Sequence, residues 1–246
     1  MKYRYKIIIE YLSINYSGWQ RQLNTLSIQE LLENAIYQFS GQNVTLKAAG
    51  RTDSGVHALG QVAHFDLPKY YEPNKVTNAI NHFLRPHTVG VIKTYIVNED
   101  FHARFKAVQR HYCYKIINQK HIAVIQRDRA WWIRDNLDVN AMKRASNHLV
   151  GKYDFTSFRA SDCQAKSPIR SISSINIIQN DNNIEIYISA RSFLYKMVRN
   201  IVGSLVLVGR GKWDPDDLLS VLLKKDRKFA GMTAPAYGLY FLKVDY

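Results

Sequence analysis

A carboxylate and a guanidinium stand two residues apart in the run 49–58, which reads AGRTDSGVHA. Glycines bracket Arg51 and Asp53, so a tight turn here would let the backbone approach a ligand closely. Alternate side chains of extended backbone point to the same side, and we therefore expect Arg51 to keep Asp53 ionised. An ionised carboxylate can serve as a nucleophile or a base. The run Asp-Ser-Gly also forms ordinary turns, so the residues alone leave both interpretations open.

Two more side chains could take part in chemistry. Arg199 lies among apolar residues of an expected helix, where a charge is costly unless it is paired. Tyr112 alternates with Tyr114 on an expected strand, and a tyrosine in such a pattern is as well explained by the core.

Hydrophobic periodicity indicates the elements that position these residues. Alternation over residues 3–11 predicts a strand, and Ser27 with Glu30 forms a capping box that opens a helix ended by Gly41. Further strands are expected at 44–48, 56–65, 89–97, 112–116, 172–178, 184–188 and 239–244. Further helices are expected from Pro73, after Asp138, at 194–205 and after Asp214.

Each half of the chain thus has the order β-α-β-β-α-β of a ferredoxin-like unit. We expect an α+β protein with two ferredoxin-like domains, joined antiparallel sheets and a cleft between them. Residues 1–103 would form the N-terminal domain with the Asp53 loop, and residues 104–246 the C-terminal domain. The segment 118–138 has no assigned element.

The net charge is unevenly distributed. The 246 residues include 34 Lys and Arg against 20 Asp and Glu, a formal charge of +14. Residues 1–103 contribute +2 and residues 104–246 contribute +12. Basic and aromatic residues also interleave at Arg127–Arg134, a mixture that suits RNA. We therefore expect the C-terminal domain to bind RNA, while a solvated basic face over core aromatics remains the alternative.

Several classes of protein do not fit the sequence. No apolar run reaches membrane-spanning length and the first residues lack a signal-peptide core, so we expect a soluble, cytoplasmic protein without a membrane partner. Cys113 and Cys163 form no metal-ligand pair, and the eight histidines show no zinc spacing. We expect neither a metal nor a disulfide.

The chain resembles the tRNA pseudouridine synthase A family, and the similarity runs nearly end to end. The blocks that carry it follow one another in the family's order. They are Gly18–Gln20 with Gln22, Thr25–Gln29, Ala49–His57, Gln61–Phe65, Asp100–Phe105, Tyr112–Tyr114, Asp154–Phe158, Met197–Gly203 and Gly238–Tyr240. The block GRTDSGVH is the most specific of them.

This resemblance implies the isomerisation of uridine to pseudouridine at positions 38, 39 and 40 of the tRNA anticodon stem-loop. The family acts without a cofactor and as a homodimer, with tRNA rather than DNA as its partner. Asp53 would be the nucleophile. Its carboxylate could attack C1′ of the ribose, attack C6 of the base or remove a sugar proton, and the sequence does not choose among the three.

The resemblance also implies roles for other residues. Tyr112 would stack on the target uracil and Arg199 would pair with Asp53. Arg51 would fill the place of the flipped base, for which a planar guanidinium is suited. Substrate contacts are further expected from Leu239, Arg104 and His57. The chain departs from the family's pattern at 12–17, which usually holds an acidic residue and a glycine, and at Lys196.

Two other functions would fit some of these residues. A non-catalytic RNA-binding protein would keep the basic half, but it would not need Arg51, Asp53, Tyr112 and Arg199 together. A base glycosylase would also place a carboxylate near C1′, and it would release free uracil.

Overall fold

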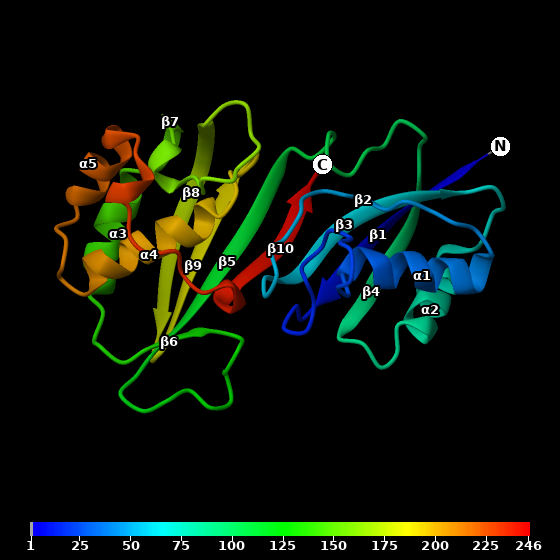
Figure 1. The fold of residues 1–246 in the computed structure, drawn as a ribbon, viewed down its shortest axis with the longest axis horizontal. Coiled ribbons are helices and arrows are strands. Elements are labelled where there is room, and N and C mark those ends of the chain that lie inside the picture. Colours follow the sequence, from blue (N-terminus) through cyan, green and yellow to red (C-terminus); the bar gives the residue numbers. More distant parts are fainter. Residues whose placement is uncertain (1) are drawn as a thin grey trace. The chain divides into compact units, whose positions relative to one another are not determined.

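The computed structural model describes residues 2–246, which fall into two compact units. Unit 1 comprises residues up to Val108 together with Phe241–Tyr246, and unit 2 comprises Gln109–Tyr240. Figure 1 follows the chain through both.

Unit 1 is a sheet with two helices. The strand order is β4-β1-β3, with β2 paired to β3 and β10 next to β3. Strand β1 is antiparallel to both neighbours, and Tyr5 lies opposite Phe65 and Ile96. Helices α1 and α2 pack against one another (Figure 1). The elements are β1 (Tyr3–Tyr11), α1 (Ile28–Ser40), β2 (Lys47–Ala48), β3 (His57–Leu67), α2 (Pro73–Phe83) and β4 (Val89–Val97), with β10 (Leu239–Asp245) starting in unit 2.

Local sequence explains the first elements. Tyr5, Ile7 and Ile9 are fully buried on β1 because alternate residues of a strand share one face. The Ser27 side chain accepts a hydrogen bond from the Glu30 amide at the start of α1, and Gly41 ends the helix with a φ of 68°. The predicted strand at 3–11 and the predicted helix between Ser27 and Gly41 are confirmed.

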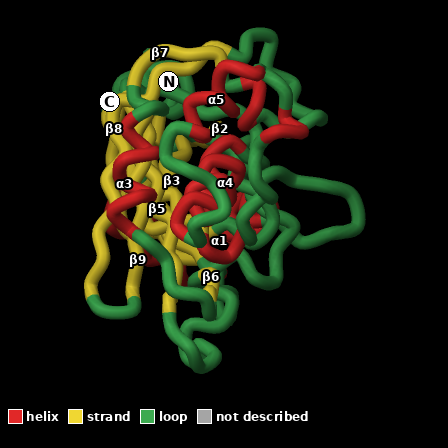
Figure 2. The backbone as a smooth tube through the Cα atoms, turned by 90° about the vertical axis from the view of Figure 1, so that its left-hand side faces the viewer, coloured by secondary structure: helices red, strands yellow, loops and turns green. Residues whose placement is uncertain are grey.

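Unit 2 contains strands β5 to β9 and three helices. Its strand order is β5-β9-β8-β7, antiparallel throughout, and β6 pairs with β5 in parallel. Figure 2 shows the helices in red and the strands in yellow. The elements are β5 (Gln109–Asn118), β6 (Trp131–Ile133), α3 (Val139–Asn147), β7 (Gly151–Asp154), β8 (Ile169–Asn180), β9 (Asn183–Ala190), α4 (Met197–Gly209) and α5 (Asp217–Lys224).

The mixed α+β class is confirmed. The sequence analysis did not anticipate β6, which lies in the unassigned segment 118–138, or the four-residue strand β7. Both strands are too short to show a period-two pattern. The second half therefore has more strands than the expected β-α-β-β-α-β order.

Candidate active site

The Asp53 loop connects β2 to β3. The Val56 amide donates to the Asp53 carbonyl at 3.1 Å and closes a tight turn, in which Gly55 has a φ of 78°. Arg51 is exposed and Asp53 is half-buried. The turn thus presents a carboxylate and a guanidinium from a loop whose two ends are anchored in neighbouring strands.

Backbone groups of the preceding segment, residues 11–19, hold this loop in place. The Trp19 amide donates to the Thr52 carbonyl at 3.0 Å, and the Ser54 hydroxyl donates to the Tyr16 carbonyl at 2.9 Å. Beneath the loop, the hydroxyls of Tyr11 and Thr52 share a buried hydrogen bond of 2.8 Å. Burial raises the pKa of Tyr11 to about 12, so its phenol stays protonated at this position.

Gly18 allows these two segments to approach so closely. A Cβ on Gly18 would lie 2.7 Å from the Thr52 carbonyl oxygen and 2.9 Å from backbone atoms of Asp53 and Ser54. Its φ of 98° is also a conformation that other residues adopt at a cost. The position of Asp53 therefore depends on a glycine 35 residues earlier in the chain.

His57 is fully buried at the start of β3, where its Nδ1 accepts a hydrogen bond of 3.0 Å from the Ser13 amide. The ring thereby joins the Asp53 loop to the segment 12–17, in which the chain departs from the family's pattern. Substrate contact by His57 stays a prediction. In this structure its side chain holds the loop.

Arg199 lies in the first turn of α4, in unit 2. Its Nε donates to the Ala234 carbonyl at 2.7 Å, and the Ala234 amide donates to the Arg199 carbonyl at 3.1 Å. The guanidinium is therefore oriented by the segment 230–235. The Tyr114 hydroxyl donates to the next carbonyl, that of Pro235, at 2.7 Å.

Asn200 attaches the segment 230–235 to helix α4. It is fully buried, and its Nδ2 donates to the Phe158 carbonyl at 2.8 Å. Its Oδ1 accepts from the Thr233 hydroxyl at 2.7 Å and from the Arg227 guanidinium at 3.3 Å. The sequence analysis missed this residue, although a polar side chain inside an apolar helix pattern was a signal for it.

Tyr112 and Leu239 lie in unit 2 as well. Tyr112 is half-buried on β5 opposite Ile188, and its ring stands edge-on to Phe193 with centroids 5.1 Å apart. Leu239 is buried at the start of β10. Burial raises the pKa of the neighbouring Tyr114 well above its ordinary value, while the charge of Arg199 acts in the opposite direction. Tyr114 and Arg199 thus share one electrostatic environment.

The expected site residues fall into two sets. Arg51 and Asp53 share one loop of unit 1, His57 begins the strand that follows it, and Arg104 lies exposed in another segment of that unit. The second set, in unit 2, consists of Tyr112, Arg199 and Leu239.

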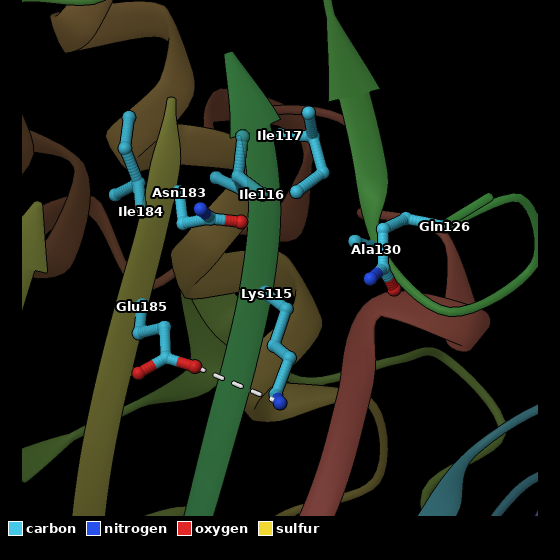
Figure 3. A pocket seen from close by; sticks show the side chains of 8 residues that line it. All are labelled: Lys115, Ile116, Ile117, Gln126, Ala130, Asn183, Ile184 and Glu185. Atoms are coloured by element: carbon cyan, nitrogen blue, oxygen red, sulfur yellow. Dashed lines mark ion pairs between the residues drawn. The ribbon is translucent and has the colours of Figure 1, made fainter. Parts of the chain in front are cut away.

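One pocket in unit 2 lies beside β5 and has a volume of about 80 Å³ (Figure 3). Lys115 and Glu185, on the neighbouring strands β5 and β9, both line it and form an ion pair of 3.6 Å. Ligand pockets usually measure roughly 300–1,000 Å³, so we assign no substrate to this one.

Within residues 2–246 no group of three or more His, Cys, Asp or Glu side chains is arranged to hold a metal ion. Over the same described part of the chain, every helix is too short or too polar to cross a membrane. Both cysteines, Cys113 and Cys163, are buried free thiols.

Comparison with known proteins adds the following findings. Residues 7–106 and 145–246 match the model of a family described as tRNA pseudouridine synthase. A protein of Ehrlichia canis (strain Jake) named tRNA pseudouridine synthase A is 52% identical over 244 residues, covering 99% of this chain and 100% of that protein. A protein of the same name from Wolbachia pipientis wMel is 50% identical over the same shares. A solved structure of a Cbf5-Nop10-Gar1 complex aligns with 9% identity and a TM-score of 0.37, covering 96% of this chain and 57% of that one, which is too weak to carry an argument.

The matched ranges include most of the expected site residues. Arg51, Asp53, Arg104 and Arg199 lie within them, whereas Tyr112 falls in the unmatched stretch between them.

Proposed function

Because the chain belongs to the tRNA pseudouridine synthase family, we propose that it isomerises uridine to pseudouridine in tRNA with Asp53 as its nucleophile. The observation that carries the proposal is the Asp53 loop, which lies within the matched residues and is held by main-chain hydrogen bonds from the segment 11–19. Such a loop can hold one carboxylate in a fixed position, as covalent catalysis requires.

The reaction breaks the bond between C1′ of the ribose and N1 of uracil and joins C1′ to C5 of the same base. Asp53 would attack C1′, attack C6 or remove a sugar proton, and each route needs the ionised carboxylate. The proton on C5 must leave before the product is complete, and Tyr112 is our candidate for stacking on the base and moving that proton.

Arginines complete the proposed site. We assign Arg199 as the ion-pair partner of Asp53, for which its hydrogen bond to the Ala234 carbonyl would set the orientation. We assign Arg51, exposed at the same turn as Asp53, to the gap that a flipped uridine leaves in the stack. Leu239 would line the uracil pocket, and Arg104 and His57 would contribute substrate contacts.

The finer parts of the proposal concern the substrate and the assembly. We propose that the target uridines are those at positions 38, 39 and 40 of the anticodon stem-loop, and that a cytoplasmic homodimer binds tRNA. Two ferredoxin-like domains, 1–103 and 104–246, would have joined sheets and a cleft between them. The +12 charge of residues 104–246 supports RNA binding by the second domain.

Replacing Asp53 by asparagine tests the proposal, because this change keeps the shape of the side chain and removes its charge. We expect pseudouridine formation in unmodified tRNA to fall by roughly 10³-fold or more, while tRNA binding survives. Asp162→Asn, at an exposed aspartate of unit 2, is the matched control and should keep wild-type turnover.

Three results would count against the proposal. Undiminished turnover in Asp53→Asn would exclude Asp53 as the nucleophile. Free uracil among the products would favour a base glycosylase. tRNA binding without pseudouridine formation by the unaltered protein would favour the non-catalytic RNA-binding protein.

A further inference from the structure

Phe105 is the most exposed aromatic side chain that the structure describes, with 73% of its surface open to solvent. It lies in unit 1, in the segment Phe101–Lys106 that follows β4. An open aromatic ring of this size is a frequent feature of binding surfaces.

The ring of Phe105 is not isolated. Its centroid lies 4.3 Å from that of His102, and the two ring planes are tilted by 35°. The guanidinium carbon of Arg104 lies 5.7 Å from the Phe105 centroid. One aromatic face is thus supported by a second ring, with a cation beside it.

Hydrogen bonds fix the backbone under this pair. The amides of Arg104 and Phe105 both donate to Nδ1 of His102, at 3.2 and 3.4 Å. The Ala103 amide donates to Nδ1 of His64 at 3.2 Å, and the Tyr246 hydroxyl donates to the Ala103 carbonyl at 2.9 Å. The segment therefore holds Phe105 in place before any ligand arrives.

His102 is held as an uncharged ring. Burial and the positive charges of Arg4, Lys47 and Arg104 lower the pKa of its imidazole, and Nδ1 must be unprotonated to accept the two amides. The ring next to Phe105 is therefore a neutral aromatic surface at physiological pH.

The surroundings favour an anionic partner. Lys47 and Arg104 are exposed and lie close enough to His102 to affect its pKa. The nearby carboxylates of Asp66 and Asp100 are each held in a 2.7 Å ion pair, with Arg4 and Lys106 respectively. An aromatic face among cations suits a nucleic acid strand, in which bases and phosphates alternate.

We propose that the ring pair of His102 and Phe105 stacks an unpaired base of an RNA strand, with Arg104 and Lys47 at the flanking phosphates. The inference rests on the proposed function only in taking tRNA as the source of that strand. It adds a base-binding surface in unit 1 to the substrate contact already expected of Arg104.

The test uses a single-stranded RNA of about ten nucleotides that carries one 2-aminopurine, whose fluorescence falls when the base stacks. We expect Phe105→Ala to weaken binding by about 5- to 100-fold and to abolish the fluorescence change, because stacking on one aromatic ring contributes about that much. Phe105→Trp should restore both. The matched control is Val108→Ala, an exposed apolar residue three positions on, which should bind like the unaltered protein.

An RNA backbone of the same length that is abasic at every position completes the design. This RNA should bind the unaltered protein and Phe105→Ala with similar affinity, because it offers no base to stack. Equal affinity of the two proteins for the 2-aminopurine RNA would overturn the inference. A change of oligomeric state in Phe105→Ala with RNA affinity unchanged would also overturn it and would indicate a protein contact instead.

The outcome is independent of catalysis. All binding measurements are made on RNA without uridine, so turnover cannot contribute. Failure of the unaltered protein to form pseudouridine in tRNA would contradict the proposed function, whereas loss of the Phe105 effect contradicts only this inference. Thermal melting of each variant checks that the exposed substitution leaves the fold intact.

Discussion

The Asp53 loop of unit 1 and the Arg199 turn of unit 2 are held by different kinds of group. Main-chain groups of Tyr16, Trp19 and Asp53 take part in most of the bonds that fix the loop, the Ser54 hydroxyl donates one of them, and Gly18 provides the space. Around Arg199, buried side chains such as Asn200 attach the segment 230–235 to its helix. The loop should therefore depend on backbone shape, and the arginine on the chemistry of a few side chains.

The largest loss of stability is expected from Asn200→Ala. The change removes three hydrogen bonds in the core and leaves the Arg227 guanidinium and the Phe158 carbonyl without that partner. We expect the free energy of unfolding to fall by about 3 kcal/mol and pseudouridine turnover to fall with it, because the Ala234 acceptor of Arg199 shifts. Urea denaturation and turnover measure the two effects.

The exposed Asn140 on α3 offers a control for this change, since Asn140→Ala deletes the same group at the surface. If the two variants unfolded at the same urea concentration, the inference that the Arg199 turn depends on buried side chains would be wrong.

Gly18→Ala should lower the free energy of unfolding by less than Asn200→Ala does. Its effect should be concentrated in the Asp53 loop. The added methyl group would meet the backbone of Thr52 and Asp53 at less than 3.0 Å, and the positive φ adds strain. We expect a loss of about 2 kcal/mol and a displaced Asp53. Gly41 also has a positive φ, but the space around it is open. Gly41→Ala therefore measures the cost of the backbone conformation without the steric overlap. Equal stability and turnover of the two variants would show that the close approach at Gly18 is unimportant.

The smallest effect is expected from the protonation of His64 in unit 1, whose Nδ1 accepts a hydrogen bond from the Ala103 amide. Burial lowers the pKa of His64 to about 4, assisted by the charges of His102 and Arg4 and opposed by Asp66. Below pH 6.5 His64 binds a proton in the unfolded chain but stays unprotonated in the folded chain. The free energy of unfolding therefore falls as the pH drops from 6.5 to 4. We expect a loss on the order of 1–2 kcal/mol over this range.

Urea denaturation at pH 7 and pH 4.5 measures the effect of His64. His64→Gln should flatten the pH dependence, and the exposed His82→Gln should not. A pH dependence that His64→Gln leaves unchanged would assign the acid sensitivity to other groups.

Long periodic segments were predictable from the sequence, and short ones were not. The strand at 3–11 and the helix capped by Ser27 combine periodicity with end signals, and both lie where expected. Strand β6 has three residues, and it forms by pairing with the last residues of β5, Ile116 to Asn118. Tertiary partners of this kind leave no mark in local sequence.

The same distinction applies to the candidate site. The motif around Asp53 could be found because its chemistry lies in side-chain types at fixed spacing. The attachment of that loop to Tyr16 and Trp19 could not, because the groups that these two residues contribute are a backbone carbonyl and a backbone amide, which nearly every residue has. Asn200 stood out as polar among apolar neighbours, but its partners lie 42 residues before and 33 residues after it.

Strand β10 sets a condition on how the protein is made. Unit 1 includes Phe241–Tyr246, and within it Gly60 on β3 lies so close to Leu242 that an added Cβ would overlap its carbonyl oxygen. The Val108 amide also donates to the Asp245 carbonyl. A ribosome must therefore synthesise more than 240 residues before the sheet around the Asp53 loop gains its last strand. Until then the nascent chain exposes an edge of β3, which chaperones or a neighbouring nascent chain could meet first.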